Sequence, residues 1–217
     1  MLFDIDETLV HTGGSGARSW NAAFEKIYGV PADIGAHTSA GETDPQVARE
    51  TFVGVMGRDP SAQELDKIYA QYLLHLAEDI WTSEKYAVLA GAEALLTKLG
   101  DAGVVLGIVS GAMEGAARTK LMPANLNRFF LFGAYGSDSA DRRELTSLAI
   151  NKARRLHGEL DAGQVFVVGD TPRDIDAAAA AGAVSVGVAT GKYSVAELKA
   201  AGAMHALASL EDPFPGF

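Results

Sequence analysis

The chain has 217 residues, 18 basic and 28 acidic side chains, a formal net charge of −10 and no cysteine. The missing cysteine excludes a disulfide scaffold, a cysteine-ligated zinc site and a thiol nucleophile, and the acidic balance argues against binding to nucleic acid or an anionic membrane. No apolar run reaches the roughly 18–20 residues that cross a membrane. Residues 1–4 contain a charge and no basic region, so they do not resemble a signal peptide, and we expect a folded cytoplasmic protein.

Short apolar segments recur along the chain, and three of them stop at polar residues. These are 1–3 before Asp4 and Asp6, 104–109 before Ser110 and Gly111, and 165–168 before Gly169 and Asp170. Segments 129–132 and 184–188 have a similar composition. Apolar runs of this length without alternation are typical of strands that are buried on both faces.

Helical patterns lie between these strands, at residues 92–100, 145–157 and 174–181. Strands that alternate with helices predict a parallel sheet covered by helices on both faces, which is a Rossmann-like α/β core. Ligands of such sheets bind beyond the carboxyl ends of the strands. All three polar clusters fall at that end, so we expect the functional site there.

Residues 13–88 interrupt this alternation and contain no convincing strand. Apolar residues recur there at helical spacing, as in the segment 65–80, which indicates amphipathic helices with one apolar face. Asp44 is expected to cap a helix over 45–55. We therefore predict an inserted α-helical cap over 13–88, and an α/β core built from 1–12 and 89–217.

Four acidic residues are predicted to meet at the edge of the sheet. Asp4 and Asp6 end one strand, and Asp170 and Asp174 follow another. Carboxylates that converge repel one another unless a proton or a cation separates them. Mg²⁺ is a suitable cation because it binds through a few carboxylates, waters and substrate phosphate. A remaining carboxylate could then act as a nucleophile, and another as a general acid and base.

These motifs resemble the haloacid dehalogenase-like hydrolase superfamily. The resemblance covers essentially the whole chain and is carried by Asp4-Ile5-Asp6-Glu7-Thr8-Leu9, by Ser110 after an apolar strand, and by Gly169-Asp170-Thr171-Pro172-Arg173-Asp174. Gly41-Glu42-Thr43-Asp44 and the tail from Ala189 to Leu210 are similar to phosphoglycolate-phosphatase-type members, which have an α-helical cap.

The resemblance implies a role for each matching residue. Asp4 would be the nucleophile that forms an aspartyl-phosphate, and Asp6 the general acid and base. Ser110 would donate a hydrogen bond to the transferring phosphoryl group. Mg²⁺ would be held by the Asp4 carboxylate, the Asp6 backbone carbonyl and Asp170, with Asp174 binding it directly or through water.

Two positions depart from the family pattern. The family usually has a Lys where this chain has Arg142 and Arg143, and we predict that Arg142 completes the phosphate site, with Arg143 as the alternative and Lys152 less favoured. An arginine fork suits phosphate oxygens. Glu7 replaces the usual Gly, which restricts the turn and adds a negative charge near the phosphate entrance.

Further residues are expected to bind substrate. We predict this role for Thr8, Arg18, Thr43 and Gly111. His11 and Asp44 are additional candidates in or near the cap, but a loop residue and a helix cap are the preferred interpretations of these two.

The predicted function is a Mg²⁺-dependent phosphomonoester hydrolase that acts on a small phosphorylated metabolite, with phosphoglycolate as the first candidate. One alternative is a phosphosugar mutase of the same superfamily, and another is a catalytically weakened protein that binds phosphometabolites. A dehalogenase is disfavoured by the presence of Asp6, Asp170 and Asp174. The expected partner is the small phosphorylated metabolite, without nucleic acid or membrane, and the expected state is a monomer or homodimer.

Overall fold

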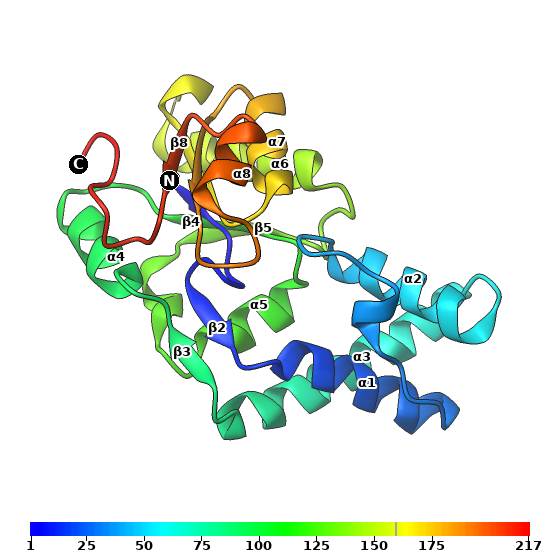
Figure 1. The fold of residues 1–217 in the computed structure, drawn as a ribbon. Coiled ribbons are helices and arrows are strands. Elements are labelled where there is room, and N and C mark those ends of the chain that lie inside the picture. Colours follow the sequence, from blue (N-terminus) through cyan, green and yellow to red (C-terminus); the bar gives the residue numbers. More distant parts are fainter. Residues whose placement is uncertain (159) are drawn as a thin grey trace.

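The computed structural model describes residues 1–158 and 160–217, and its centre is a six-stranded parallel sheet (Figure 1). The strand order is β5-β4-β1-β6-β7-β8, and each neighbouring pair is parallel. The strands are β1 (Leu2–Phe3), β4 (Gly107–Ser110), β5 (Phe132–Tyr135), β6 (Phe166–Gly169), β7 (Val184–Val188) and β8 (His205–Leu207). Strand order reverses beside β1, and such a reversal opens a crevice at the carboxyl ends.

Both faces of the sheet are buried. Successive strand residues point to opposite sides, so neighbouring residues of one strand belong to different apolar clusters. Leu2 packs with Val109 and Val167 in one apolar cluster. Phe3 belongs to the other cluster, together with Ile108. This explains the continuous apolar strands in the sequence and confirms the predicted Rossmann-like α/β core.

Helices cover the two faces. Helices α6 and α7 contribute to the cluster around Leu2, and α4 and α5 contribute to the cluster around Phe3. The core helices are α4 (Ala92–Asp101), α5 (Glu114–Leu121), α6 (Arg142–His157), α7 (Pro172–Ala180) and α8 (Val195–Ala200), with short 3-10 turns at η2 (Leu126–Phe129) and η3 (Ala162–Gln164).

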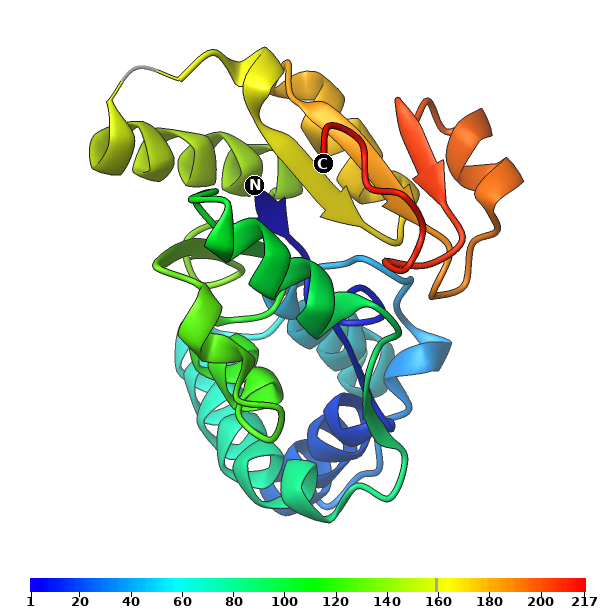
Figure 2. The same cartoon turned by 90° about the vertical axis from the view of Figure 1, so that its left-hand side faces the viewer.

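A helical group lies beyond the carboxyl ends of the strands, as both ribbon views show (Figures 1 and 2). It contains α1 (Ser15–Tyr28), η1 (Ile34–Ala36), α2 (Asp44–Met56) and α3 (Ala62–Thr82). Helices α1 and α3 pack together through Trp20, which stacks on Tyr72 with ring centroids 3.9 Å apart. Offset aromatic stacking of this kind adds about 0.5–1.5 kcal/mol beyond area burial.

An antiparallel pair of strands connects this helical group to the sheet. Strand β2 (Val10–Thr12) pairs with β3 (Tyr86–Val88). Our expectation that 13–88 contains no strand is therefore wrong at its last residues. The β3 run is only three residues long and is partly exposed, so it lacks the apolar signature by which buried strands are found.

Other element boundaries also differ from the sequence predictions. The structure confirms 184–188 as β7, but β5 begins at Phe132, whereas the prediction placed a strand at 129–132. Phe129 ends a 3-10 turn, and Phe130 is buried in the core from that turn. Phe130 and Phe132 are buried, but Leu131 between them is 72% exposed, so the apolar run marks neither a continuous strand nor a continuous buried segment. Helix α2 has Thr43 as its N-cap, with Asp44 as its first residue, and the predicted cap at Asp44 is wrong by one position.

Candidate active site

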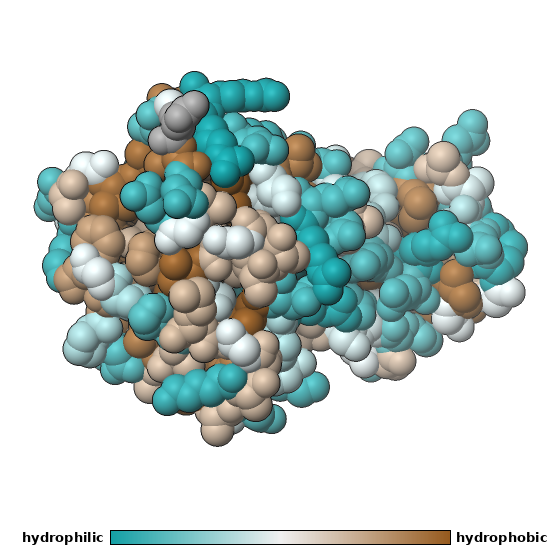
Figure 3. All heavy atoms as spheres, turned by 90° about the horizontal axis from the view of Figure 1, so that it is seen from above, coloured by the Kyte–Doolittle hydropathy of each residue, from teal (hydrophilic) through white to brown (hydrophobic). Residues whose placement is uncertain are grey.

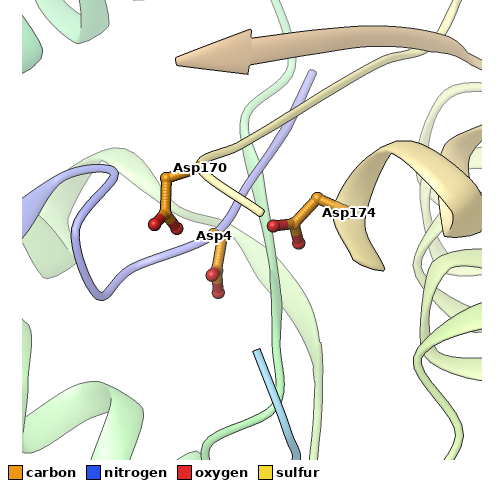
Figure 4. A group of neighbouring side chains, drawn as sticks. All are labelled: Asp4, Asp170 and Asp174. Carbon is orange, nitrogen blue, oxygen red and sulfur yellow. The ribbon is translucent and has the colours of Figure 1, made fainter. Parts of the chain in front are cut away.

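The predicted acidic residues come together at the carboxyl end of the sheet. Asp4 follows β1, Asp170 follows β6, and Asp174 lies in the first turn of α7. One carboxylate oxygen from each lies within 4.8 Å of the others, and all three residues are buried. Figure 4 shows their carboxyl groups facing a common space. We call these residues the carboxylate group.

A buried arginine joins this group from the first turn of α6. Arg142 places Nη2 2.7 Å from Asp4 Oδ2 and 2.6 Å from Asp174 Oδ1. Its Nε also donates to Asp174 Oδ1 at 2.8 Å. The alternatives lie elsewhere: the exposed Arg143 pairs with Asp176, and Lys152 donates to Gly133 O and Asp138. Among the three candidates, the fold brings Arg142 to the acids.

The two oxygens of Asp174 are already hydrogen-bonded. Oδ1 accepts from Arg142, and Oδ2 accepts from the backbone N–H and the hydroxyl of Thr171 at 3.0 and 2.7 Å. This second set is the capping box that begins α7. Asp174 is therefore held firmly in place, and Asp4 and Asp170 have more capacity to bind a further cation.

Burial raises the pKa of the other two acids. Burial, followed by the charges of Asp174 and Asp4, raises the pKa of Asp170 to about 8. For Asp4, burial outweighs the opposing attraction of Arg142 and raises the pKa to about 6. A contact with a cation such as Arg142 usually lowers a carboxyl pKa. The pKa of Asp4 is raised despite this contact, so the buried site disfavours the negative charge of an ionised Asp4.

The donor set fits Mg²⁺. Three buried carboxylates and one guanidinium leave two negative charges uncompensated when all the acids are ionised, and one dication would balance them. Carboxylate oxygens are the protein ligands that Mg²⁺ prefers. Asp4 and Asp170 would hold such an ion, with Asp174 next to it; the predicted role of the Asp6 backbone carbonyl stays a prediction.

Replacing Arg142 should be costly even without any ligand. In Arg142→Met the carboxylates lose their buried partner, and breaking a buried ion pair from one side costs about 3–5 kcal/mol. We expect urea unfolding at pH 8 without divalent ions to show a decrease of this order. Arg143→Met is the matched control, because its pair is exposed and should be worth at most about 1 kcal/mol. Equal effects of the two substitutions would contradict the structural assignment.

Ser110, Gly111 and Thr43 border the same site. The Ser110 hydroxyl is buried and accepts from the backbone N–H of Ala112 at 3.3 Å. A Cβ on Gly111 would lie 3.0 Å from Arg142 Nη1, so a side chain there would crowd the guanidinium. Thr43 donates its hydroxyl to Ala140 O at 3.1 Å. The structure thus brings Ser110 and Gly111 to the carboxylate group, whereas the Thr43 hydroxyl is engaged by the backbone.

The turn after Asp6 has a conformation at position 7 that suits glycine better than the glutamate present in this chain. Glu7 has φ +54°, a left-handed conformation that a residue with a Cβ adopts at a cost. The Glu7 carboxylate contacts His11 Nδ1 at 2.6 Å, and its carbonyl accepts from the Thr190 hydroxyl. The Thr8 side chain is buried, and its hydroxyl has no hydrogen-bond partner among the described residues.

Arg18 is not brought to the carboxylate group. It forms a salt bridge with Asp79 at 2.6 Å, and its side chain is about half exposed. It also donates to the carbonyl of Gly13. These contacts tie α1 to α3 at the surface, and its predicted contact with substrate would require it to leave them.

A cavity of about 270 Å³ opens between the carboxylate group and the helical group. Asp4, Asp6 and Arg142 line it from the sheet side, and Trp20 and Tyr72 line it from α1 and α3. Its size suits a small molecule whose reactive end faces Asp4. Trp20 and Tyr72 are both buried, so they belong to the core and also form a wall of the cavity.

One charged residue of this cavity was not predicted at all. Lys120 extends from α5, is only 6% exposed and places Nζ 2.6 Å from Asp6 Oδ2. The sequence contained a signal for it, because Lys120 lies four residues after the buried Ala116 and next to the buried Leu121. A charged residue within the apolar stripe of a helix indicates a buried partner.

Hydrophilic and hydrophobic residues are interspersed on the face seen in Figure 3. In the described part of the chain, no helix combines the length and the apolar character that a membrane span requires.

The sequence is similar to those of known phosphatases. The chain is 30% identical to a phosphoglycolate phosphatase from Rhodospirillum rubrum, over all of this chain and 92% of that protein. It is 26% identical to a phosphoglycolate phosphatase from Neisseria gonorrhoeae, over 88% of this chain and 80% of that protein.

Solved structures share the fold. CbbY from Rhodobacter sphaeroides, in complex with phosphate, superimposes with a TM-score of 0.76 at 18% identity and covers 97% of this chain and 94% of its own. A protein assigned as a beta-phosphoglucomutase from Bacteroides vulgatus has a TM-score of 0.70 at 22% identity and covers 97% of this chain and 84% of its own. The family model for haloacid dehalogenase-like hydrolases matches residues 1–182. The chain therefore belongs to the haloacid dehalogenase-like hydrolase family.

Proposed function

We propose that the protein is a Mg²⁺-dependent phosphatase that hydrolyses a small phosphorylated metabolite through an aspartyl-phosphate on Asp4. The observation that carries this proposal is the buried carboxylate group with Arg142, open to a cavity of about 270 Å³. The group combines a nucleophile with positive charge, which phosphoryl transfer requires.

The reaction has two steps. An Asp4 oxygen attacks phosphorus, the bond to the leaving oxygen breaks, and Asp6 gives its proton to that oxygen. A water molecule then attacks the phosphorus of the aspartyl-phosphate, Asp6 takes the water proton, and inorganic phosphate leaves with Asp4 restored. Asp6 is suited to both steps because it lines the same cavity as Asp4.

Other residues stabilise the charge on the phosphoryl group. Arg142 would bind a phosphoryl oxygen while it keeps its contact with Asp174. Ser110 would donate its hydroxyl proton to another oxygen. Bound Mg²⁺, held by Asp4, the Asp6 backbone carbonyl and Asp170, with Asp174 directly or through water, would neutralise developing negative charge.

Residues 13–88 would act as the cap on a core of 1–12 and 89–217. A cap that closes over the cavity excludes water and contacts the leaving group. Phosphoglycolate is the first candidate substrate, because the relatives in Rhodospirillum rubrum and Neisseria gonorrhoeae carry that name and the cavity is small. Thr8, Thr43 and Gly111 remain proposed substrate-binding residues, of which Gly111 lines the cavity, and Arg18 would have to rearrange.

The test is phosphate release from phosphoglycolate and a panel of other phosphate monoesters, with Mg²⁺ and with EDTA. We expect multiple turnovers with Mg²⁺, at least about 100-fold slower with EDTA, and the highest kcat/KM for a small substrate. Turnover that is unchanged by EDTA would contradict the metal dependence, and tight binding without release would favour a phosphometabolite-binding protein.

A phosphosugar mutase is the second candidate, because the Bacteroides vulgatus neighbour is assigned as one. A mutase returns the phosphoryl group to the sugar and needs a bisphosphate, whereas a phosphatase passes it to water. Incubation with a sugar monophosphate and a trace of its bisphosphate separates the two, since an isomeric sugar phosphate without free phosphate would identify a mutase.

A further inference from the structure

Lys120 is a buried charge that the proposed reaction does not yet use. Lys120 lies on α5 and contacts Asp6, and the two residues are 114 positions apart in the chain. Its ammonium group is 2.6 Å from Asp6 Oδ2, and the residue is only 6% exposed. A buried charge without a partner costs several kcal/mol, so this contact is strongly constrained.

The contact separates the two acids of the first motif. Asp6 lies two residues after Asp4, but among the described residues the carboxylate group contains Asp4 and not Asp6. The Asp6 side chain lines the cavity instead, as do Lys120 and Tyr72. The Tyr72 hydroxyl is buried and has no hydrogen-bond partner among the described residues.

We infer that Lys120 is a positioning residue, which holds the Asp6 carboxyl group on the leaving-group side of the cavity and away from the carboxylate group. This inference rests on the proposed function, because it assigns Lys120 to the proton transfer at Asp6. Without Lys120, the Asp6 side chain would have other rotamers available, and fewer of them would reach the leaving oxygen.

Such a role has a specific kinetic signature. A leaving group that is a weak base departs with little help, whereas a more basic one needs its proton during bond cleavage. Losing the position of Asp6 therefore slows esters with basic leaving groups most. A purely structural role for Lys120 would slow all substrates by the same factor.

The experiment compares phenyl phosphate with 4-nitrophenyl phosphate, since their rings are alike and their phenolates differ in basicity. We expect Lys120→Met to lower kcat/KM for phenyl phosphate about 100-fold, and for 4-nitrophenyl phosphate about 10-fold or less. Lys120→Arg keeps the charge and should recover part of the rate with phenyl phosphate. If the Met variant does not fold, the Arg variant is compared with wild type on the same two esters, where a smaller but still selective loss is expected.

A double-mutant cycle tests whether Lys120 acts through Asp6. In the Asp6→Asn background, Lys120→Met should change kcat/KM less than threefold, because the group that it positions is gone. Lys67→Met, an exposed change on α3, is the matched control and should behave as wild type.

Two results would overturn the inference. One is that Lys120→Met lowers kcat/KM equally for both esters, and the other is that Lys120→Met lowers kcat/KM by the same factor in the Asp6→Asn background as in wild type. Either result leaves the proposed function intact as long as the wild type releases phosphate. A wild type that hydrolyses neither ester nor any metabolite in the panel would instead refute the proposed function.

Discussion

Replacing Asp4 with Asn should lower turnover by at least about 10³-fold while the protein stays folded. The amide is a poor nucleophile, so the aspartyl-phosphate does not form. The Asn carbonyl oxygen can still occupy the place of the Asp4 oxygen that now lies 2.7 Å from Arg142 Nη2. Steady-state phosphate release measures the first effect, and urea unfolding measures the second.

The stability of this variant makes the result interpretable. Asp4 is buried, and its pKa is raised to about 6, mainly by burial. Removing its charge therefore should leave the free energy of unfolding at pH 8 unchanged or higher. Asp4→Ala serves as a second variant that cannot revert by deamidation, and Asp176→Asn, which alters an exposed acid paired with Arg143, is the control that should keep full activity. Substantial turnover by both Asp4 variants would exclude Asp4 as the nucleophile.

Without divalent ions, the protein should lose stability as the pH rises from about 4 to 8. The pKa of Asp170 is about 8 in the folded protein, above its ordinary 3.8. Between these values the folded state binds more protons than the unfolded state, so the free energy of unfolding falls as pH rises. Asp4 adds to this fall between about 4 and 6. One pKa unit corresponds to about 1.4 kcal/mol, so the total for the two acids is on the order of 5–10 kcal/mol.

Mg²⁺ should reverse this loss, and most strongly at high pH. The ion binds the ionised carboxylates, so protons compete with it below about pH 8. At a concentration 100 times Kd it would stabilise the protein by about 2.7 kcal/mol. Thermal unfolding at pH 6 and pH 8, with Mg²⁺ and with EDTA, measures both effects.

Asp170→Asn provides the matched test of the same argument. It removes an acid whose pKa is raised to about 8, compared with about 6 for Asp4. We expect a metal-free protein that is more stable than wild type at pH 8, with a weaker dependence on pH and little response to Mg²⁺. A variant that retains the full response to Mg²⁺ would show that the ion binds elsewhere.

Much of the fold could be predicted from local sequence. Strand β7 lies at the predicted residues 184–188, since its continuous apolar pattern follows from burial on both faces. The prediction failed where that pattern was absent or misleading. Strand β3 is partly exposed, and strand β8 at 205–207 is at the sheet edge and also partly exposed, so neither shows an apolar run. At 129–132 the apolar run crosses the boundary between a 3-10 turn that ends at Phe129 and strand β5 that begins at Phe132.

The chain by itself determined which acids face the site, because Asp4 and Asp170 directly follow buried parallel strands, and such strands end at one edge of the sheet. Only the tertiary structure decided which cations accompany them. Arg142 and Arg143 are adjacent in sequence, yet the first is buried against Asp4 and the second is exposed beside Asp176. Lys120 reaches Asp6 across 114 residues. The direction of a helical side chain depends on how its helix packs against the sheet, and local sequence does not contain that information.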